Sequence, residues 1–370
     1  MAEAGAAQLA QHPARRMSLR VLSVAFPFAR VSADPVGGAE QVLAQIDRHL
    51  VQRGHESVVI AASGSRVRGR LVAVPMPEGE WNDAVRARQH ARIRAAIERT
   101  LAQSRFDVVH CHGVDFADYL PSPGIPLLAT LHLPLDRYPL AVLRPRRPLT
   151  WLQPVSHEQC RGAPPDLALL APIPNGVADN PFALRARPCG AALAMGRICP
   201  EKGFDDAIRA ARMANTDLCI AGEVFPWPEH LRYAREVLAP MLDARRRCIN
   251  ALHGPRKQCW LARARCVLIA SRARETSSLV AMEALAAGTP VIAYPVGAIP
   301  ELIEDGVTGF LVDGPRAMAA AIRHAGEIDR RTCLHVARAR CRLAGTLDAY
   351  LALYARLAAE ACAQPARRCA

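Results

Sequence analysis

Lysine is scarce in this chain of 370 residues. Of its 47 basic residues only Lys202 and Lys257 are lysines, which leaves 45 arginines and a net charge of +13. Aromatic residues are also few, at 5%. Single-stranded nucleic acid is usually bound by aromatic stacking platforms beside a basic groove, and duplexes by recognisable motifs. Neither is present, so no nucleic-acid partner is expected, although the positive charge leaves that class as a distant alternative.

The sequence also lacks the patterns of a disulfide scaffold, a zinc site or a membrane span. Its 12 cysteines form no C-x-x-C pair and no His/Cys cluster at zinc spacing. No apolar run reaches the roughly 18 residues that a span requires, and no charged-then-apolar signal opens the chain. We therefore expect a reducing, cytoplasmic setting. Residues 1–17 are polar and rich in alanine, and we expect them to form a disordered extension.

What is present is a regular alternation of apolar β-type runs with helical patterns, which is typical of doubly wound α/β folds. At about 150 residues per domain, the length predicts two domains. We expect a Rossmann-like domain over residues 18–170, a second over 171–345, and a C-terminal helix over 346–362 that packs back on the first. The proline-rich stretch Pro164–Pro181 is the expected linker.

The expected strands of each domain follow from short apolar runs bounded by turn residues. In the first domain they are Leu19–Ala25, Ser57–Ala62, Phe106–Cys111, Pro126–Leu131 and Leu152–Val155. In the second they are Ala191–Arg197, Asp217–Ala221, Ile249–Leu252, Arg265–Ala270, Pro290–Ala293 and Gly309–Val312. Ligands of such sheets bind beyond the carboxyl ends of the strands, so candidate residues are sought there.

Two strand ends suggest a phosphate site. Gly37 and Gly38 precede the first helix, where small residues and free N–H groups let a phosphate approach the backbone. Arg197 and Lys202 follow the first strand of the second domain and could neutralise a diphosphate from two directions. A tight turn and a pair of solvated charges are the structural alternatives, and the spacing alone does not decide between them.

A third strand end carries two carboxylates around a helix start. Glu275 precedes the helix expected at Ser278–Ala287, and Glu283 lies inside it. The N–H groups of Ser278 and Leu279 could bind a diphosphate, with the carboxylates binding sugar and ribose hydroxyls. Glu283 lies in an apolar stretch, where an unpaired carboxylate is costly, so it needs a partner. A ligand hydroxyl or a structural hydrogen bond would satisfy it.

Together these segments resemble the family 4 glycosyltransferases, a retaining family of the GT-B architecture. The resemblance rests on the Glu-x7-Glu spacing of Glu275 and Glu283, the Ala-Leu-Ala-Ala-Gly-Thr-Pro run after it, the Gly37-Gly38 turn, the Arg197/Lys202 pair and Thr130-Leu131-His132. It covers the chain from about residue 19 to residue 357. The sequence departs from the commonest family form at Thr276, directly after the first glutamate.

The resemblance implies a hexosyltransferase that takes sugar from a nucleotide-sugar, with the acceptor on the first domain and the donor on the second. A UDP-sugar is favoured and GDP-mannose is the alternative. Gly37, Gly38, Ser278 and Leu279 would bind the donor, Arg197 and Lys202 its diphosphate, Glu275 and His132 its sugar, and Glu283 its ribose. Front-face attack would retain the anomeric configuration. A GT-B sugar-nucleotide epimerase or glycan synthase is the closest alternative.

No Asp-x-Asp occurs, the pattern by which metal-dependent glycosyltransferases hold Mn²⁺ or Mg²⁺, so we expect no metal and no other cofactor. The acceptor, whether a sugar, a lipid-linked or a small molecule, has no readable motif. The segment Arg86–Arg105 is a basic amphipathic helix around Ile93, Ile97 and Leu101. Its apolar stripe could pack on the core or lie peripherally on an anionic membrane at the inner face.

Overall fold

The computed structural model describes residues 18–32, 35, 37–79 and 81–368, and residues 1–17, expected to be disordered, lie outside this part. Within it the strands form two six-stranded parallel sheets, in the orders β3-β2-β1-β4-β5-β6 and β12-β11-β10-β7-β8-β9. Six parallel strands with a reversal of strand order at the centre of the sheet are typical of the doubly wound Rossmann arrangement. The predicted α/β class of two Rossmann-like domains is confirmed.

The strands lie close to their expected positions. The first sheet contains β1 (Arg20–Val24), β2 (Glu56–Ala62), β3 (Arg70–Val74), β4 (Val108–Cys111), β5 (Leu127–Leu131) and β6 (Thr150–Pro154). The second contains β7 (Ala192–Arg197), β8 (Leu218–Glu223), β9 (Arg246–Asn250), β10 (Val267–Ile269), β11 (Val291–Ala293) and β12 (Gly309–Leu311). β3 was not expected from the sequence, because residues 63–69 join it to β2 without a helix and its edge position leaves it half exposed.

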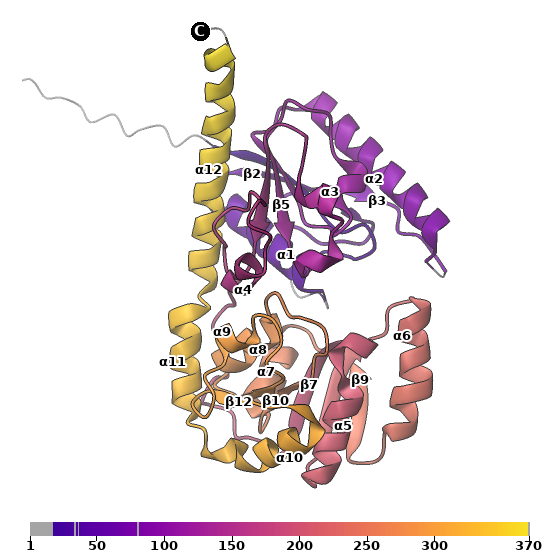
Figure 1. The fold of residues 1–370 in the computed structure, drawn as a ribbon, viewed down its shortest axis with the longest axis vertical. Coiled ribbons are helices and arrows are strands. Elements are labelled where there is room, and N and C mark those ends of the chain that lie inside the picture. The colour runs from indigo at the N-terminus through magenta and orange to yellow at the C-terminus, as the bar shows by residue number, and fades with distance from the viewer. Residues whose placement is uncertain (1–17, 33–34, 36, 80, 369–370) are drawn as a thin grey trace, which may run out of the picture.

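The helices cover the sheets and connect the two domains (Figure 1). They are α1 (Gly38–Gln52), α2 (Asp83–Gln103), α3 (Leu140–Leu143), α4 (His157–Arg161), α5 (Phe204–Met213), α6 (Pro228–Arg232), α7 (Gly254–Arg263), α8 (Leu279–Ala286), α9 (Ile299–Leu302), α10 (Gly314–His324), α11 (Arg330–Arg340) and α12 (Leu343–Arg368). Because helices cover both faces, the central strands are largely apolar, and all five residues of β5 are buried.

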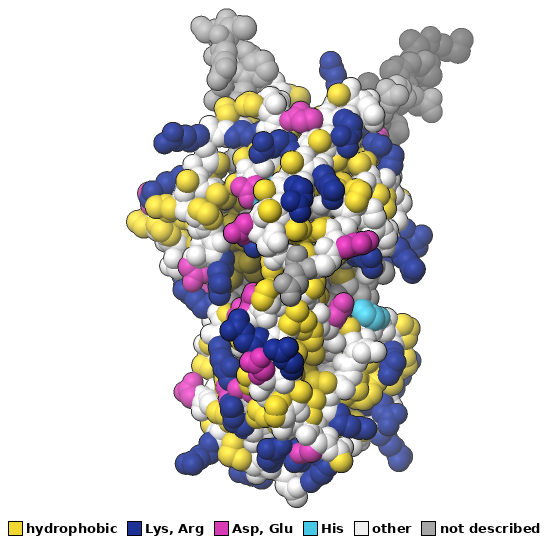
Figure 2. Space-filling view, turned by 90° about the vertical axis from the view of Figure 1, so that its right-hand side faces the viewer, with side chains coloured by type: hydrophobic (Ala, Val, Ile, Leu, Met, Phe, Trp, Pro, Cys, Tyr) yellow, Lys and Arg dark blue, Asp and Glu magenta, His cyan; other side chains and the backbone are white. Residues whose placement is uncertain are grey.

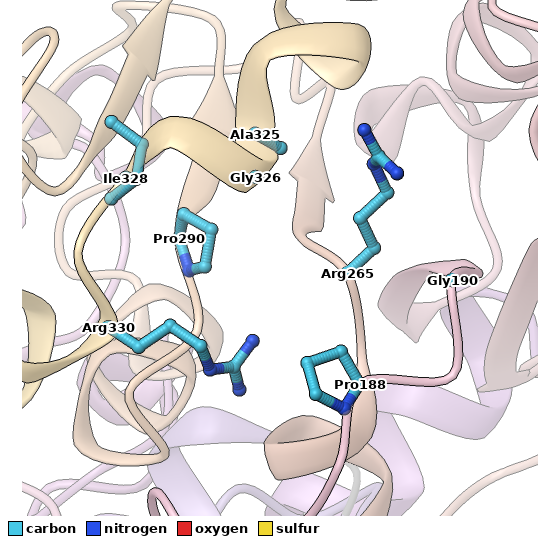
Figure 3. Close-up of a pocket in the computed structure, with 8 residues that line it drawn as sticks. All are labelled: Pro188, Gly190, Arg265, Pro290, Ala325, Gly326, Ile328 and Arg330. Carbon is cyan, nitrogen blue, oxygen red and sulfur yellow. The ribbon is translucent and has the colours of Figure 1, made fainter.

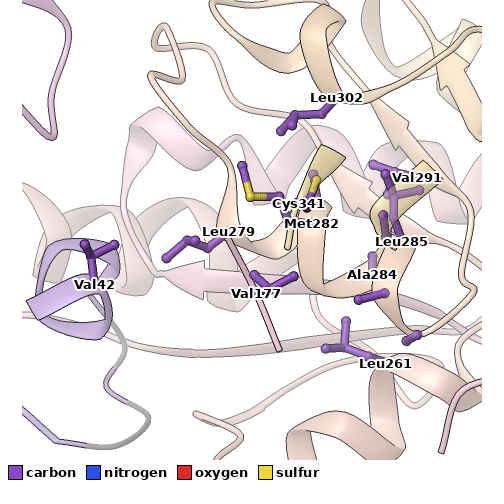
Figure 4. Packing of buried hydrophobic residues seen from close by; sticks show 14 of the residues in the cluster. Val42, Val177, Leu261, Leu279, Met282, Ala284, Leu285, Val291, Leu302 and Cys341 are labelled. Carbon is purple, nitrogen blue, oxygen red and sulfur yellow. The ribbon is translucent and has the colours of Figure 1, made fainter. Parts of the chain in front are cut away.

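One apolar cluster spans the contact between the domains (Figure 4). Val42 of α1 and Leu279 of α8 belong to it, as do Leu285 and Val291 deeper in the second domain. The Leu279 side chain packs against the Gly38 backbone, since a Cβ added to Gly38 would lie 3.4 Å from the Leu279 Cδ1 atom. The starts of α1 and α8 therefore face each other across the domain boundary.

The long helix α12 runs beside the first domain, although the chain reaches it from the second (Figure 1). Tyr354 places its hydroxyl 2.7 Å from the Nδ1 atom of His110 in β4, and Leu357 is fully buried. The linker runs beside the short connection between α11 and α12, since the Val177 N–H donates to the Cys341 carbonyl at 2.8 Å. The two passages of the chain between the domains thus touch each other.

The basic helix of the first domain is α2, and its apolar stripe packs on the core. Ile93 and Ile97 are fully buried, whereas Arg88 and Arg94 are exposed. That stripe is therefore already covered by protein. None of the helices within the described residues is both long and apolar enough to pass through a bilayer. On the face drawn in Figure 2, basic side chains are spread over both domains and do not gather in one stripe.

Candidate active site

A cavity of about 440 Å³ lies between the domains, at the carboxyl ends of the central strands. Its lining comes from both domains and includes polar groups at the starts of α1 and α8. All of the residues predicted from the sequence line it: Gly37, Gly38, His132, Arg197, Lys202, Glu275, Ser278, Leu279 and Glu283. The fold therefore brings together side chains that lie up to 246 positions apart, as from Gly37 to Glu283.

The first wall is the start of α1, where the chain turns at Gly37 and Gly38. A Cβ on Gly37 would lie 1.8 Å from a carboxylate oxygen of Glu40, so a larger residue there would require the Glu40 side chain to move. Glu40 is buried, and burial raises its pKa although the charge of Arg197 opposes that shift. The start of α1 thus presents Glu40 toward the strand-end arginine of the other domain.

The second wall carries the two predicted cations. Arg197 ends β7, with its guanidinium 5.7 Å from the ring centre of Phe225, and its buried Nε atom has no hydrogen-bond partner among the described residues. Lys202 ends the short 3-10 turn Pro200–Lys202 and donates to Glu275 at 2.6 Å. An ammonium group has three donors, so Lys202 keeps two for a further anion.

Glu275 lies just before α8 and accepts hydrogen bonds from Lys202 and from the Ser271 hydroxyl. Burial by itself would raise its pKa, but Lys202, the Ser271 hydroxyl and the charge of Arg197 together lower it below the usual value. The carboxylate is therefore ionised at neutral pH. Gly297 packs against the backbone of Glu275 and has a φ of 60°. A Cβ at this position would lie 2.2 Å from the Glu275 carbonyl oxygen, so only glycine fits.

Glu283 lies in α8 and has two protein partners, Lys257 of α7 and Gln41 of α1, each 2.8 Å from its Oε1 atom. The sequence left two kinds of partner open for Glu283, a ligand hydroxyl or a structural hydrogen bond. The structure shows structural hydrogen bonds, from the Lys257 ammonium and the Gln41 amide. Lys257 lies on α7, a helix that was not among those expected from the sequence. Each of the chain's two lysines therefore pairs with one of the two motif glutamates.

Three histidines form a line from α12 to the cavity. His110 bonds Tyr354 and Thr130, His112 lies 3.1 Å from the Nε2 atom of His132, and the rings of these last two stack at 5.3 Å. Burial lowers the pKa of His110 and His112 well below the usual value, and that of His132 to about 4. All three imidazoles are neutral at pH 7.

His132 is also held from the opposite domain. The hydroxyl of Thr276 donates to the His132 carbonyl at 2.6 Å, so the departure from the commonest family residue at this position joins the domains beside the cavity. Two ion pairs also cross the boundary, Arg274 with Glu158 and Arg161 with Glu301. The domains are thereby joined by directional contacts as well as by the apolar cluster.

Several polar residues of the cavity wall were not among the predicted site residues, and they include Glu40, Gln41, Asn175 and Lys257. Asn175 lies in the linker and donates to Ser277 at 3.1 Å, and its buried carbonyl oxygen has no partner among the described residues. The scarcity of lysine was the available signal for Lys257. The others required the two domains to be docked.

A smaller cavity, about 260 Å³, lies in the second domain and is lined by residues that precede β10 and β11 (Figure 3). Arg265 and Arg330 line it, but both already donate to backbone carbonyls, of Ile322 and Ala264 respectively. It has no acidic or nucleophilic side chain among its described lining residues. These residues thus provide packing and no group suited to catalysis.

Two Rossmann-like domains that face each other across a cavity with cations and helix starts define the GT-B class of glycosyltransferases. The family model described as "Glycosyltransferase Family 4" matches residues 36–162, and "Glycosyl transferases group 1" matches residues 190–327. One model thus matches each domain, and together with the fold they make the chain a glycosyltransferase of the GT-B type.

Relatives and solved structures are similar to this chain to different extents. The D-inositol 3-phosphate glycosyltransferase of Acidothermus cellulolyticus is 28% identical over 77% of both chains. That of Streptomyces avermitilis is 51% identical, but over only 16% of this chain and 14% of its own length. Sucrose-phosphate synthase from Thermosynechococcus elongatus has a TM-score of 0.74 at 16% identity, over 92% of this chain and all of its own. Anabaena HepE, solved with UDP-glucose, has a TM-score of 0.69 at 18% sequence identity. The match covers 91% of this chain and all of HepE.

The neutral histidines predict a pH-dependent stability. In the unfolded chain an imidazole binds a proton below about pH 6.5, whereas His110 and His112 stay neutral when folded. The free energy of unfolding should therefore fall as pH falls below about 6.5, by up to about 1.4 kcal/mol per pH unit for each histidine.

His112→Gln should flatten this dependence by one such contribution in denaturant melts at pH 5 to 7.5. The control is His335→Gln at an exposed position, and equal slopes for all three proteins would contradict the prediction.

Proposed function

We propose that this chain is a retaining, metal-independent hexosyltransferase that uses a nucleotide-sugar donor, with a UDP-sugar favoured over GDP-mannose. One observation carries the proposal: the starts of α1 and α8 face each other at the cavity, and Arg197 and Lys202 line the same cavity from the segment between β7 and α5. Helix starts present N–H groups and a positive dipole end, so this is an arrangement suited to a diphosphate.

The helix starts are open to an anion on the side of the second domain. Ser278, the residue before α8, makes no side-chain bond to the first turn of the helix, and Gly37 before α1 has no side chain that could make one. At α1, however, the Glu40 carboxylate lies against Gly37. We therefore assign the main phosphate contacts to the Ser278 and Leu279 N–H groups with Arg197 and Lys202, and a close backbone approach to Gly38.

The two glutamates divide the donor between them. Glu275 and His132 border the cavity on either side of Thr276 and would bind the sugar hydroxyls. Glu283 would accept from the ribose hydroxyls with its second oxygen, since Oε1 already accepts from Lys257 and Gln41. A carboxylate has two acceptor oxygens, so the second one is available for ribose hydroxyls. Both assignments follow the family resemblance, and the cavity lining supports them.

The chemistry assigned to the site is front-face substitution. The bond from the sugar's anomeric carbon to the diphosphate oxygen breaks, the acceptor oxygen bonds to that carbon on the same face, and the acceptor's proton passes to the leaving diphosphate. Arg197 and Lys202 stabilise the charge that develops on the diphosphate. Glu275 is a poor base because its pKa is lowered, and burial also lowers the pKa of His132, so neither is assigned the acceptor's proton.

The donor preference has support from structures of similar fold. Anabaena HepE has been solved with UDP-glucose, and the pneumococcal O-GlcNAc transferase GtfA with UDP and GlcNAc. Titration of the protein with UDP, UDP-glucose, UDP-GlcNAc and GDP-mannose tests the assignment directly. The acceptor stays open among sugars, lipid-linked and small molecules. The relatives' names mention an inositol phosphate, and Arg137 of the first domain lines the cavity where an acceptor phosphate could bind.

An epimerase would work on the donor alone. Release of an epimerised sugar from UDP-GlcNAc without any acceptor would favour that alternative over transfer. A cytoplasmic setting with peripheral contact at an anionic membrane also stays a proposal. Such contact would use the exposed arginines of α2, since its apolar stripe is buried.

The first functional prediction concerns the cations. Arg197→Ala and Lys202→Ala should each lower kcat/KM by a factor that corresponds to about 2 to 4 kcal/mol, because each removes charge stabilisation in the transition state. Both residues lie near a strand end, so the fold should persist in circular dichroism. Arg209→Ala, a half-exposed arginine of α5, is the control. Turnover within threefold of the parent for both variants would refute the assignment.

The second concerns divalent ions. Cationic side chains replace a catalytic divalent ion in this proposal, so adding Mg²⁺ or Mn²⁺ to EDTA-treated protein should leave the initial rate unchanged. The measurement is sugar transfer from the donor identified by titration. A loss of activity with EDTA that Mg²⁺ or Mn²⁺ restores would show that the metal-free scheme is wrong.

The third separates the glutamates. Glu275→Gln should lower kcat while UDP binding is largely kept, whereas Glu283→Gln should weaken UDP itself by about 1 to 3 kcal/mol for a lost charged hydrogen bond. Lys257→Met is the matched control, since it breaks the same ion pair without removing the carboxylate. If Glu283 serves only that pair, both variants lower the melting temperature and calorimetry finds UDP affinity unchanged in Glu283→Gln.

A further inference from the structure

Three potential metal ligands meet beside the donor cavity, although they come from separate elements. Cys199 and Glu201 belong to the turn between β7 and α5, and His230 belongs to α6. The Sγ atom, a carboxylate oxygen and an imidazole nitrogen lie within 4.8 Å of one another. No sequence spacing indicated the group, because the histidine follows Glu201 by 29 positions and no second cysteine is involved.

The group is largely buried, and two of its polar atoms lack partners. Cys199 is fully buried and His230 is 4% exposed. The Nδ1 atom of His230 and the Oε2 atom of Glu201 have no hydrogen-bond partner among the described residues. The Cys199 thiol donates to the Arg197 carbonyl at 3.5 Å, an ordinary distance for a sulfur donor. Unsatisfied buried polar atoms are costly, and two in one cluster require an explanation such as an ion.

We propose that Cys199, Glu201 and His230 bind one Zn²⁺ ion. Zinc takes sulfur at about 2.3 Å and nitrogen or oxygen at about 2.0 to 2.2 Å in a tetrahedron, which puts ligand atoms roughly 3.3 to 3.7 Å apart. The observed limit of 4.8 Å is larger, a difference that side-chain rotation can close. Thiolate and imidazole ligands select zinc over Mg²⁺ and Mn²⁺, and water would take the fourth position.

The charges of the site fit a dication. Burial raises the pKa of Cys199 and lowers that of His230, so without metal the thiol and the imidazole are both neutral at pH 7. On binding, the thiol loses its proton to solvent and a sulfur–zinc bond forms. Thiolate and carboxylate then carry two negative charges against two positive ones. Arg197, whose charge acts on His230, therefore faces a neutral site.

The position of the ion gives it a structural role distinct from diphosphate neutralisation. Two of its ligands lie between Arg197 and Lys202 in the chain, and α6 follows directly after Trp227. The Trp227 ring packs against Trp81 of the first domain at 5.0 Å. The ion would thus join the turn that carries both cations to the segment that touches the opposite domain. This inference does not depend on the proposed donor or on the transfer reaction.

Metal-binding measurements on the full chain test the proposal. After treatment with EDTA and its removal, titration calorimetry with Zn²⁺ should find one site that Cys199→Ser lacks and that His230→Gln weakens about tenfold or more. With Co²⁺ the parent should show a thiolate charge-transfer absorption that disappears in Cys199→Ser. Calorimetry in two buffers of different ionisation enthalpy should find about one proton released per ion bound.

The chain has 12 cysteines, so a matched control is needed. Cys333 is also fully buried, with its thiol 3.6 Å from the Thr308 carbonyl, and Cys333→Ser should keep the site. Melting curves without metal check that each variant folds. Equal zinc stoichiometry and cobalt absorption in the parent and in Cys199→Ser, or no zinc bound by the folded parent, would overturn the proposal. UDP titration of the same samples reports separately on the donor site.

Discussion

Glu283 bonds to Lys257 of its own domain and to Gln41 of the other, and this contact lies where the starts of two helices oppose each other. Positive helix ends and nearby cations would repel one another if no carboxylates were placed among them. Glu275 and Glu283 reduce that repulsion, one beside each lysine. The docking of the domains and the shape of the cavity therefore depend on the same few charges.

The strands, and the cavity residues that follow strand ends, could be predicted from the sequence because both depend on local patterns. Parallel strands buried on both faces give largely apolar runs such as Leu127–Leu131, and ligands of these sheets gather at strand ends, so Arg197 and Glu275 could be located from the sequence alone. β3 gave a weak signal because it is a short edge strand. In addition, no helix separates β3 from β2, so the alternation of strands and helices does not predict a strand there.

What could not be predicted depends on contacts between distant segments. The partners of Glu283 come from α1 and α7, and nothing in the sequence near Glu283 specifies them. The same holds for Thr276, whose hydroxyl bonds to His132 of the other domain, and for Cys199 with His230. A sequence pattern can give the residue type that a position needs, but the identity of a partner across a domain boundary depends on how the domains dock.

The path of α12 has a consequence for synthesis on the ribosome. Tyr350 and Tyr354 bond to Thr130 and His110 in the sheet of the first domain, yet they follow these residues by 220 and 244 positions, and the whole second domain is made in between. The nascent first domain therefore leaves the exit tunnel without these partners and with an apolar strip uncovered. Domains usually fold as units in the order of their synthesis. Here the first domain reaches its final packing only after α12 has been made and has docked.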